Sequence, residues 1–523
     1  MAQTQRQEIP AYADTVVVGG GTAGATLAGR LVEGADHSVL LLEAGPDYGP
    51  YSAGGWPPVL LDAREMAVST HSWNYESAAT HGKPGLLLER ARVLGGCSSH
   101  NGCAAVWGHR EDYDGWAALG NTGWETKSLL PLVETVMRKM RVSIPAPEEL
   151  TPWHQACLQA APGAGLPVRE NLNDIDQTHG IAINPVNIVA NGVRWNSAFA
   201  YLDPVRDRAN LTIRGNVLAD RLLIEGGRVV GLQAVGPDGP VAIRAGRVVL
   251  CSGAYGSPLT LMRSGVGASD ELRELGIAPV HQLPGVGRNL QDHALIPLLY
   301  SATPELIESM ARFEADGGLM REEGTTIVAC SAQCQGPFDL HIYPISSRVA
   351  DSWARDLHRR EGPAGWLFGV ASALLSPRSY GTICLSSRDP EAPPRIDHAY
   401  FTDQDDRDVA ALVDGIELSR EVAAQEPLKS LIGTEDEPGV SFADREELAR
   451  FVRANSAHAY HPVGTCKMGP ASDPMAVVDP RGKVHGLDGL YVADAAIMPV
   501  IPRANTNIPV AVIAEKISSL LLE

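Results

Sequence analysis

The feature that most constrains the fold is a β-branched run that leads directly into three spaced glycines near the start of the chain. Residues 15–18 read Thr-Val-Val-Val, a composition typical of a strand buried in a parallel sheet. Gly19, Gly21 and Gly24 follow with GxGxxG spacing, and residues 25–31 predict a helix with one apolar face. A strand, a glycine turn and a helix in this order predict the first half of a Rossmann unit, whose turn lets the backbone approach a pyrophosphate.

A second strand and an acidic residue complete this unit. Residues 39–42 predict a buried strand, and Glu43 ends it nineteen residues after Gly24. A carboxylate at that place accepts the ribose hydroxyls of an adenosine and disfavours a cofactor with a 2′-phosphate. The unit therefore predicts an adenine dinucleotide and leaves NAD and FAD both open.

The composition restricts the remaining classes of protein. With 523 residues and a formal charge of −19, the chain is long enough for two large domains and would be repelled by nucleic acids and anionic membranes. The eight cysteines show no CxxC and no paired metal-ligand spacing, so no metal site is expected and a reducing compartment fits best. Residues 1–14 lack the apolar core of a signal peptide, and no apolar run is long enough to predict a membrane helix. These features predict a cytoplasmic protein.

The middle and the C-terminal part of the chain predict a second sheet and a return to the first domain. Residues 211–258 predict a meander of short strands with the turns EGGR and GPDG, which closes on a buried strand at 248–251. Between 296 and 455, strand-like segments alternate with an amphipathic helix and proline-rich turns, as expected for an antiparallel sheet. A helix is predicted from about Ile508 to Leu522.

We therefore predict an α/β fold, α+β overall, with two domains. A discontinuous Rossmann-like domain for the dinucleotide comprises residues 1–160, 205–295 and 456–523. A substrate-binding domain, built on the antiparallel sheet, comprises residues 161–204 and 296–455.

Four stretches in this order resemble the glucose–methanol–choline (GMC) family of FAD-dependent oxidoreductases, over essentially the whole chain. They are GGGTAGATLAGRL with LLEAG, RVLGGCSSHNG with DYDGW, GAYGSPLTLMRSGVG with LPGVGRNLQDH, and HPVGTCKMG with VADAAIMPVIPRANTNIPVAVIAEK. The resemblance implies FAD as the cofactor and a hydride that passes from an alcohol carbon to flavin N5. The motif GGCSSHN is most similar to the corresponding motif of the choline oxidase-like branch of the alcohol oxidases.

The glycine motif and the resemblance together assign a set of residues to FAD. The set is Gly19, Gly21, Thr22, Ala23, Gly24, Glu43, Ala44, Gly95, Gly96, Ser99, His100, Asn101, Gly102, Cys103, Ala104, Val217, Gly253, Asp494, Ala495, Asn505 and Thr506. His100 stands where the resemblance implies a covalent bond between a histidine and the flavin 8-methyl carbon. Such a bond withdraws electrons and makes the flavin a stronger oxidant. A loop histidine hydrogen-bonded to backbone is the alternative.

Alcohol oxidation also needs a base on the hydroxyl group, because an alcohol is a poor hydride donor until its proton begins to leave. His461 in HAYHPVGT matches the family's catalytic histidine, and neutral imidazole accepts a proton near neutral pH. Asn505 in RANTN matches the second active-site position, which is His or Asn in the family. Its amide can donate a hydrogen bond to the developing alkoxide. His458 has no such match and is predicted to be structural.

The substrate is constrained by one departure from the choline oxidases. Leu295 stands where those enzymes carry an acid that faces the trimethylammonium group. Burying a cation against leucine is unfavourable, so we expect a neutral primary alcohol, benzylic or furanic, to be preferred over choline. Residues 296–455 are expected to line its pocket.

The electron acceptor and the assembly state are less constrained. O2 is the expected acceptor, giving H2O2, and a dehydrogenase that uses a quinone or another carrier remains the alternative. A hydroxynitrile lyase that keeps FAD without redox chemistry and a light-driven fatty-acid decarboxylase also share the scaffold. The expected partners are thus a small alcohol and an electron acceptor, with monomer and homodimer both open.

Overall fold

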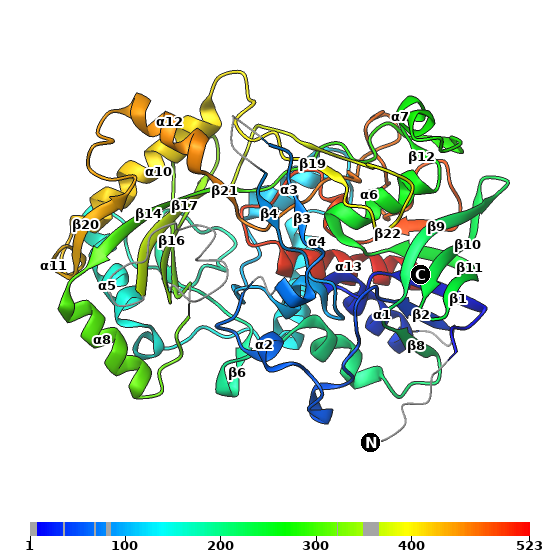
Figure 1. Cartoon of the computed structure of the whole chain (residues 1–523), viewed down its shortest axis with the longest axis horizontal. Coiled ribbons are helices and arrows are strands. Elements are labelled where there is room, and N and C mark those ends of the chain that lie inside the picture. The colour runs from blue at the N-terminus through cyan, green and yellow to red at the C-terminus, as the bar shows by residue number, and fades with distance from the viewer. Residues whose placement is uncertain (1–7, 35–36, 67–68, 80–84, 322, 349–365) are drawn as a thin grey trace.

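The described part of the chain forms two large, seven-stranded sheets, one at each end of an elongated molecule (Figure 1). The structure is a computed structural model that describes residues 8–34, 37–66, 69–79, 85–321, 323–348 and 366–523. Parts of two predicted segments, residues 1–14 and 296–455, lie outside these ranges. The mixed α/β architecture confirms the predicted fold class.

The first sheet has seven strands and a parallel centre. Its strands, in spatial order, are β8 (Leu211–Arg214), β2 (Val39–Leu42), β1 (Tyr12–Val18), β11 (Gly239–Leu250), β10 (Arg228–Gly236) and β9 (Leu218–Glu225), with β22 (Leu490–Val492) also paired to β11. The strands β8, β2, β1, β11 and β22 run parallel, and β9 and β10 are antiparallel additions. The predicted βαβ unit is β1, α1 (Thr22–Gly34) and β2.

The predicted meander is correct for three of its strands and wrong for the first. The turns EGGR and GPDG join β9 to β10 and β10 to β11. Leu211 instead pairs with Val39, so β8 lies at the opposite edge, parallel to β2. The closing strand is also longer than predicted, since β11 starts at Gly239 and ends at Leu250. Its first half pairs antiparallel with β10 and its second half parallel with β1.

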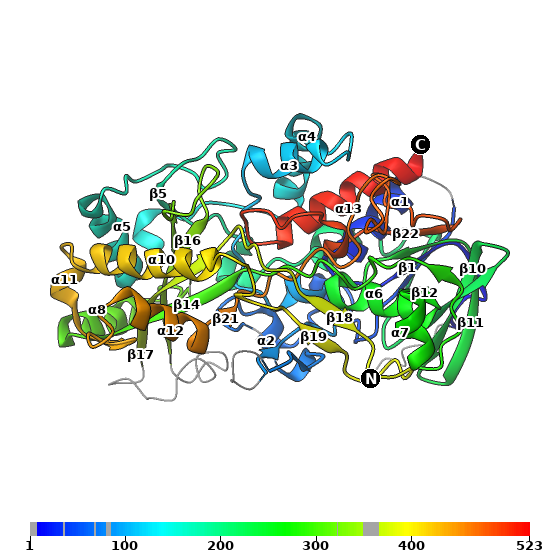
Figure 2. The same ribbon diagram turned by 90° about the horizontal axis from the view of Figure 1, so that it is seen from above.

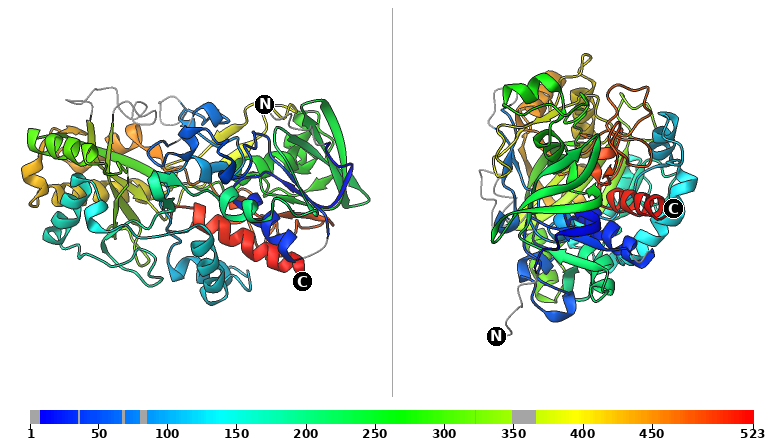
Figure 3. Two further views of the ribbon diagram at one scale, coloured as in Figure 1. Left: turned by 90° about the horizontal axis from the view of Figure 1, so that it is seen from below. Right: turned by 90° about the vertical axis from the view of Figure 1, so that its right-hand side faces the viewer.

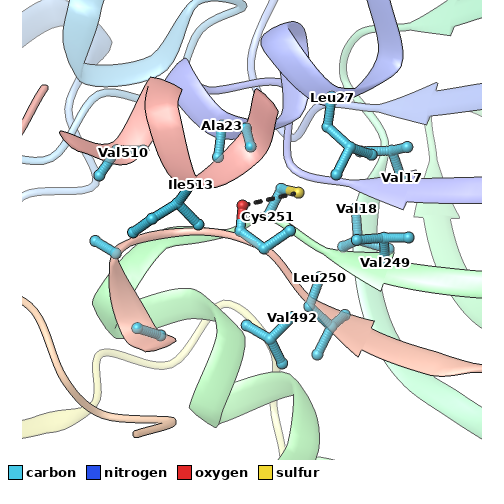
Figure 4. Packing of buried hydrophobic residues seen from close by; sticks show 14 of the residues in the cluster. Val17, Val18, Ala23, Leu27, Val249, Leu250, Cys251, Val492, Val510 and Ile513 are labelled. Carbon is cyan, nitrogen blue, oxygen red and sulfur yellow. Dashed lines mark hydrogen bonds between the residues drawn. The ribbon is translucent and has the colours of Figure 1, made fainter. Parts of the chain in front are cut away.

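Helix α1 and the C-terminal helix α13 (Asn507–Leu522) lie side by side against this sheet (Figures 2 and 3). Figure 4 shows the buried side chains of the contact: Ala23 and Leu27 from α1 and Val510 and Ile513 from α13 face the ends of β1, β11 and β22. The predicted apolar face of α1 is buried, and the predicted C-terminal helix is confirmed. The chain end thus completes the domain that its beginning opens.

The second sheet is antiparallel throughout, as predicted. Its strands are β20 (Ile432–Glu437), β14 (Ala294–Ala302), β17 (Trp366–Leu374), β16 (Leu340–Arg348), β15 (Thr325–Ala329) and β5 (Gly180–Ile183), with β21 (Ala457–His458) paired to β14. The helices α10 (Arg407–Ala423) and α5 (Pro152–Ala160) cover one face, where Ile296, Leu298 and Ile342 contribute to the core. Alternate residues, such as Leu295 and Ile345, point to the other face.

The domain boundaries remain a prediction, and the packing of α5 bears on one of them. Trp153, Ala156 and Cys157 are buried in the core of the second sheet. This contact favours a first boundary before α5 rather than after residue 160.

Shorter elements connect the two sheets. They are α2 (Pro58–Leu61), β3 (Tyr75–Glu76), β4 (Leu87–Leu88), α3 (Arg110–Ala118), α4 (Thr126–Lys139), β6 (Ile188–Val189), β7 (Val193–Arg194), α6 (Gly253–Arg263), β12 (Val266–Gly267), α7 (Ser269–Glu274), β13 (His281–Gln282), α8 (Pro304–Ala315), β18 (Thr382–Cys384), β19 (Arg395–Asp397), α11 (Leu428–Leu431) and α12 (Arg445–Asn455). Among the helices in the described ranges, none has the length and apolar character to cross a membrane.

Gly24 offers a test of the β1–α1 turn. An ideal Cβ on Gly24 would lie 1.8 Å from the carbonyl oxygen of Gly19, closer than any contact can be. We expect Gly24→Ala to lower the free energy of unfolding by about 3 kcal/mol or more, measured by denaturant or thermal unfolding. Gly115→Ala, on the exposed side of α3 with no atom within 4 Å of its Cβ, is the control and should be neutral or slightly stabilising. Equal stability of the two variants would contradict this packing.

Candidate active site

A cavity of about 400 Å³ lies between the two sheets, and the predicted site residues gather around it. Nineteen of them line it: Gly19, Gly21, Thr22, Ala23, Glu43, Ala44, Gly96, His100, Asn101, Gly102, Cys103, Ala104, Val217, Gly253, His461, Asp494, Ala495, Asn505 and Thr506. They come from the turns after β1, β2, β8, β11, β21 and β22, from the loop after β4 and from the segment before α13. In an open α/β sheet, ligands bind at this carboxyl edge of the parallel strands.

Three residues of the predicted set do not line the cavity. Gly24 packs against Gly19 inside the turn. Gly95 has a positive φ of 86°, and the Ser99 hydroxyl donates to the carbonyl of Leu94 at 3.0 Å. These residues shape the loops that face the cavity.

The Glu43 carboxylate joins the turns after β1 and β2. Its two oxygens accept hydrogen bonds from the backbone N–H groups of Gly20 and Gly45, each at 2.8 Å. Burial raises the pKa of Glu43 to about 7, and these hydrogen bonds oppose the rise. The carboxyl therefore sits at the end of β2 on the cavity wall, as an adenosine site requires.

The N-terminal ends of two long helices, α1 and α13, reach the cavity and offer hydrogen-bond donors to a dinucleotide. The first-turn N–H groups of α1 face the cavity, and no acidic residue occupies that turn. At the start of α13, the side-chain amide nitrogen of Asn507 is buried and has no hydrogen-bond partner among the described residues, whereas its oxygen accepts from the Thr22 hydroxyl at 2.9 Å. Asn507 was missed from the sequence, although it is the last residue of the RANTN motif.

His461 and Asn505 meet on the cavity wall. The Asn505 Nδ2 lies 3.4 Å from His461 Nε2, and His461 Nδ1 lies 3.0 Å from His293 Nδ1. The backbone N–H of His461 donates to the Asp292 carboxylate at 2.9 Å. Burial, followed by the proximity of His293 and Arg90, holds the pKa of His461 well below its usual range. The imidazole is therefore neutral and able to accept a proton.

The hydrogen bonds of this group assign its tautomer. An amide nitrogen can only donate, so His461 Nε2 accepts from Asn505 and His461 Nδ1 carries the hydrogen. That N–H donates to His293 Nδ1. Burial lowers the pKa of His293 to about 3, so its ring is neutral and can accept this bond. The lone pair of Nε2 thus lies beside Asn505 in the cavity.

Sequence reasoning missed three groups around the base, although QDH contains two of them. His293 contacts the base directly, and Asp292 holds its backbone. Burial raises the pKa of Asp292 to about 7, against the hydrogen bond from His461 and the charge of Arg90. Arg90 also reaches the cavity, and its guanidinium donates to the carbonyl of Tyr460 at 3.1 Å. Within the described ranges, no group of three or more His, Cys, Asp or Glu side chains is arranged to hold a metal ion.

Two further residues lie where the sequence alone could not position them. His458 lines the cavity, but its ring donates through Nε2 to the carbonyl of Leu87 at 2.9 Å, a structural contact. Leu295 lies on the cavity wall with Ile345 and Ala371. The same wall carries one carboxyl group, that of Glu323, which no sequence motif indicated.

The fold and this site together define an FAD-dependent oxidoreductase that acts on CH–OH groups. Family models described as GMC oxidoreductase match residues 13–295 and 377–514. The chain belongs to the GMC oxidoreductase family, and its cofactor is FAD.

Relatives and solved structures agree with this family. The mitochondrial choline dehydrogenase of Mus musculus is 35% identical over 97% of this chain and 89% of its own length. An oxygen-dependent choline dehydrogenase of Paraburkholderia phytofirmans is 36% identical over 97% of this chain and 93% of its own length. The crystal structure of pyridoxine 4-oxidase from Mesorbium loti has a TM-score of 0.84 at 29% identity, covering 97% of this chain and 99% of that one. A fungal aryl-alcohol oxidase has a TM-score of 0.80 at 21% identity, over 98% and 99%, and shares the fold.

Proposed function

We propose that the protein oxidises a primary alcohol to an aldehyde, with His461 as the base. The observation that carries this proposal is the neutral Nε2 of His461 beside the Asn505 amide in the cavity. A substrate hydroxyl placed between these two groups would donate its proton to His461 Nε2 and accept a hydrogen bond from Asn505 Nδ2. FAD, when bound, supplies the acceptor for the hydride.

His293 is a positioning residue in this proposal. Its Nδ1 holds the Nδ1–H of His461 and so keeps the Nε2 lone pair directed at the substrate. When Nε2 takes the proton, the same hydrogen bond stabilises the imidazolium. This arrangement uses a neutral acceptor where many catalytic histidines have a carboxylate.

The electron acceptor that we propose is O2, with H2O2 as the second product. The names of similar proteins, the oxygen-dependent choline dehydrogenases and the pyridoxine 4-oxidase, support it. A dehydrogenase that passes electrons to a quinone or another carrier is the second candidate, favoured by the mitochondrial choline dehydrogenases. A cytoplasmic location fits the eight cysteines, all of which are free thiols.

The substrate that we propose is an alcohol without a quaternary ammonium group, on an aromatic or furanic ring. The apolar wall formed by Leu295, Ile345 and Ala371 supports it, because a permanent cation there would lose its hydration to hydrocarbon. The pyridoxine 4-oxidase shares the fold at 29% identity, and its name also refers to an alcohol on an aromatic ring.

A covalent bond between His100 and the flavin is part of the proposal. His100 is buried at the cavity, and its Nδ1 has no hydrogen-bond partner among the described residues. Burial, with the charges of Arg90 and Arg194, keeps the pKa of His100 well below its usual range. A neutral imidazole with a free lone pair is the form that could hold a carbon substituent.

Removal of the base tests the mechanism. We expect His461→Ala to slow flavin reduction by about 10²–10⁴-fold with FAD still bound, because the hydroxyl proton loses its acceptor. Asn505→Ala should lose about 10²-fold, the effect of one donor to a developing oxyanion. Anaerobic stopped-flow absorbance measures both rates, and His179→Ala, at an exposed position, is the control. Unchanged reduction in His461→Ala would assign the base to another group.

A panel of alcohols tests the substrate and the acceptor together. We expect benzyl alcohol and furfuryl alcohol to give higher kcat/KM than choline, with one H2O2 formed per aldehyde in air. Choline as the best substrate would contradict the proposed pocket. Turnover with a quinone but without peroxide would favour the dehydrogenase. If no alcohol bleaches the flavin under anaerobic conditions, the non-redox hydroxynitrile lyase is the remaining candidate.

Denaturation tests the covalent link. Because a covalent bond survives unfolding, acid precipitation should give a yellow pellet, and intact mass spectrometry should show the chain with one FAD attached. His100→Ala should release its flavin on denaturation. It should also lower the reduction potential of the flavin, so that the oxidation of less activated alcohols slows more than that of benzylic ones. If the wild-type pellet is colourless and the flavin stays in the supernatant, His100 is a loop histidine.

A further inference from the structure

Glu323 reaches the cavity through an irregularity in the second sheet. In β15 and β16, Ile327 pairs with Ile342, whereas Glu323 forms a bridge with Ile345, so the register shifts by one residue between them. A shift of one residue moves a side chain to the opposite face of a sheet. Ile342 faces the core beneath the helices, but Ile345 faces the cavity, and Glu323 shares its face.

The wall beside Glu323 is apolar, and no cationic side chain among the described residues pairs with its carboxyl group. Ile345 and Ala371 belong to a buried apolar cluster on this wall, and the partly buried Leu295 and Met66 pack against it. In the part of the chain that the structure describes, no hydrogen bond or ion pair reaches the Glu323 carboxyl group. Burial raises its pKa to about 7. A carboxyl group on an apolar wall is stabilised when a ligand supplies a hydrogen-bond partner.

Tyr343 is a polar neighbour of Glu323 and already has a partner of its own. Its hydroxyl lies 3.0 Å from His341 Nδ1, and the charge of Glu323, added to burial, raises the pKa of the phenol. Tyr343 therefore stays neutral and is held by His341. It leaves Glu323 as the group that faces the cavity with its hydrogen-bonding capacity unused.

The base and Glu323 lie on the same cavity, on residues joined by one sheet. His293, which contacts His461, directly precedes β14, and Leu295 near the start of β14 lies on the same wall as Ile345. A ring between them would direct a hydroxymethyl group to His461 and its other side to Glu323. Leu295 and Ala371 would then cover its faces.

We propose that Glu323 binds a basic ring nitrogen of the substrate, so that the protein prefers primary alcohols carried on a nitrogen heterocycle. One proton is shared between the carboxyl oxygen and the ring nitrogen. This inference rests on the proposed alcohol oxidation and adds the substrate class. A quaternary nitrogen has neither a lone pair nor an N–H and cannot form this bond.

Three alcohols of nearly one shape test the proposal in the wild-type holoenzyme. They are pyridin-4-ylmethanol, benzyl alcohol and 4-(hydroxymethyl)-N-methylpyridinium. We expect kcat/KM for pyridin-4-ylmethanol to exceed that of each of the others by about 10-fold or more, the effect of one hydrogen bond to an ionisable group. A preference for the methylpyridinium would mean simple charge attraction, and equal values would mean no nitrogen site; either result overturns the proposal.

Variants assign the preference to Glu323. Glu323→Leu should bring the ratio of kcat/KM for pyridin-4-ylmethanol to kcat/KM for benzyl alcohol close to one. Glu323→Gln, whose amide can still donate to a ring nitrogen, should keep part of the ratio. Glu308→Leu, on the exposed side of α8, is the matched control. An unchanged ratio in both Glu323 variants, or an equal loss with both alcohols, contradicts the assignment.

A binding measurement separates failure of this proposal from failure of the proposed function. 4-Methylpyridine and toluene carry no hydroxyl, and their binding can be followed by the absorbance of the bound flavin. We expect the wild type to bind 4-methylpyridine about 10-fold more tightly than toluene, and Glu323→Leu to bind them equally. Selective binding without oxidation of any alcohol would keep the nitrogen site and reject the oxidation. Oxidation without selective binding would do the reverse.

Discussion

The parallel pairing of β22 with β11 is the constraint on which the site depends. It brings the last third of the chain back to the turns of the first, since Val248 pairs with Leu490 and Leu250 with Val492. Asp494, just after β22, accepts from the Gly253 N–H at 2.8 Å and the Ser257 hydroxyl at 2.6 Å. Burial raises the pKa of Asp494 to about 6, so these hydrogen bonds are what make its burial tolerable. Without this return, His461 and Asn505 would not face the same cavity as the glycine turn.

Burial has opposite effects on the pKa values of the imidazole and the carboxyl groups around the cavity. Around His461 it depresses the pKa of the imidazoles and keeps a chain of neutral groups, Asn505, His461 and His293, in one hydrogen-bonded order. At Glu43, Asp292 and Glu323 it raises the pKa of carboxyl groups. Backbone N–H groups compensate the first two carboxyls, but no backbone N–H of the described residues reaches the Glu323 carboxyl group. This difference is the basis on which we propose Glu323 as the group that binds the substrate nitrogen.

The sequence predicted most of the fold because its strongest signals are local. The GxGxxG turn, the flanking strands and the apolar face of α1 depend on neighbours within about twenty residues. The two antiparallel turns also carried their own signals, EGGR and GPDG. The position of β8 did not, because a four-residue strand shows no preference for either edge of a sheet. The hydrogen bonds that place it are to β2, far away in the chain.

The sequence by itself determined the dinucleotide fold, the two sheets and, through the resemblance of its motifs, the histidine and the asparagine of the site. Residue type and spacing suffice there, because a phosphate turn and a proton acceptor each require particular side chains. Only the tertiary structure decided the hydrogen-bond order of His461 with His293 and the exposure of Glu323 to the cavity. Both result from pairings between distant segments, and one of them depends on a one-residue shift in register. Such a shift cannot be predicted from hydrophobic periodicity, because the alternation of side chains along a strand is the same in either register.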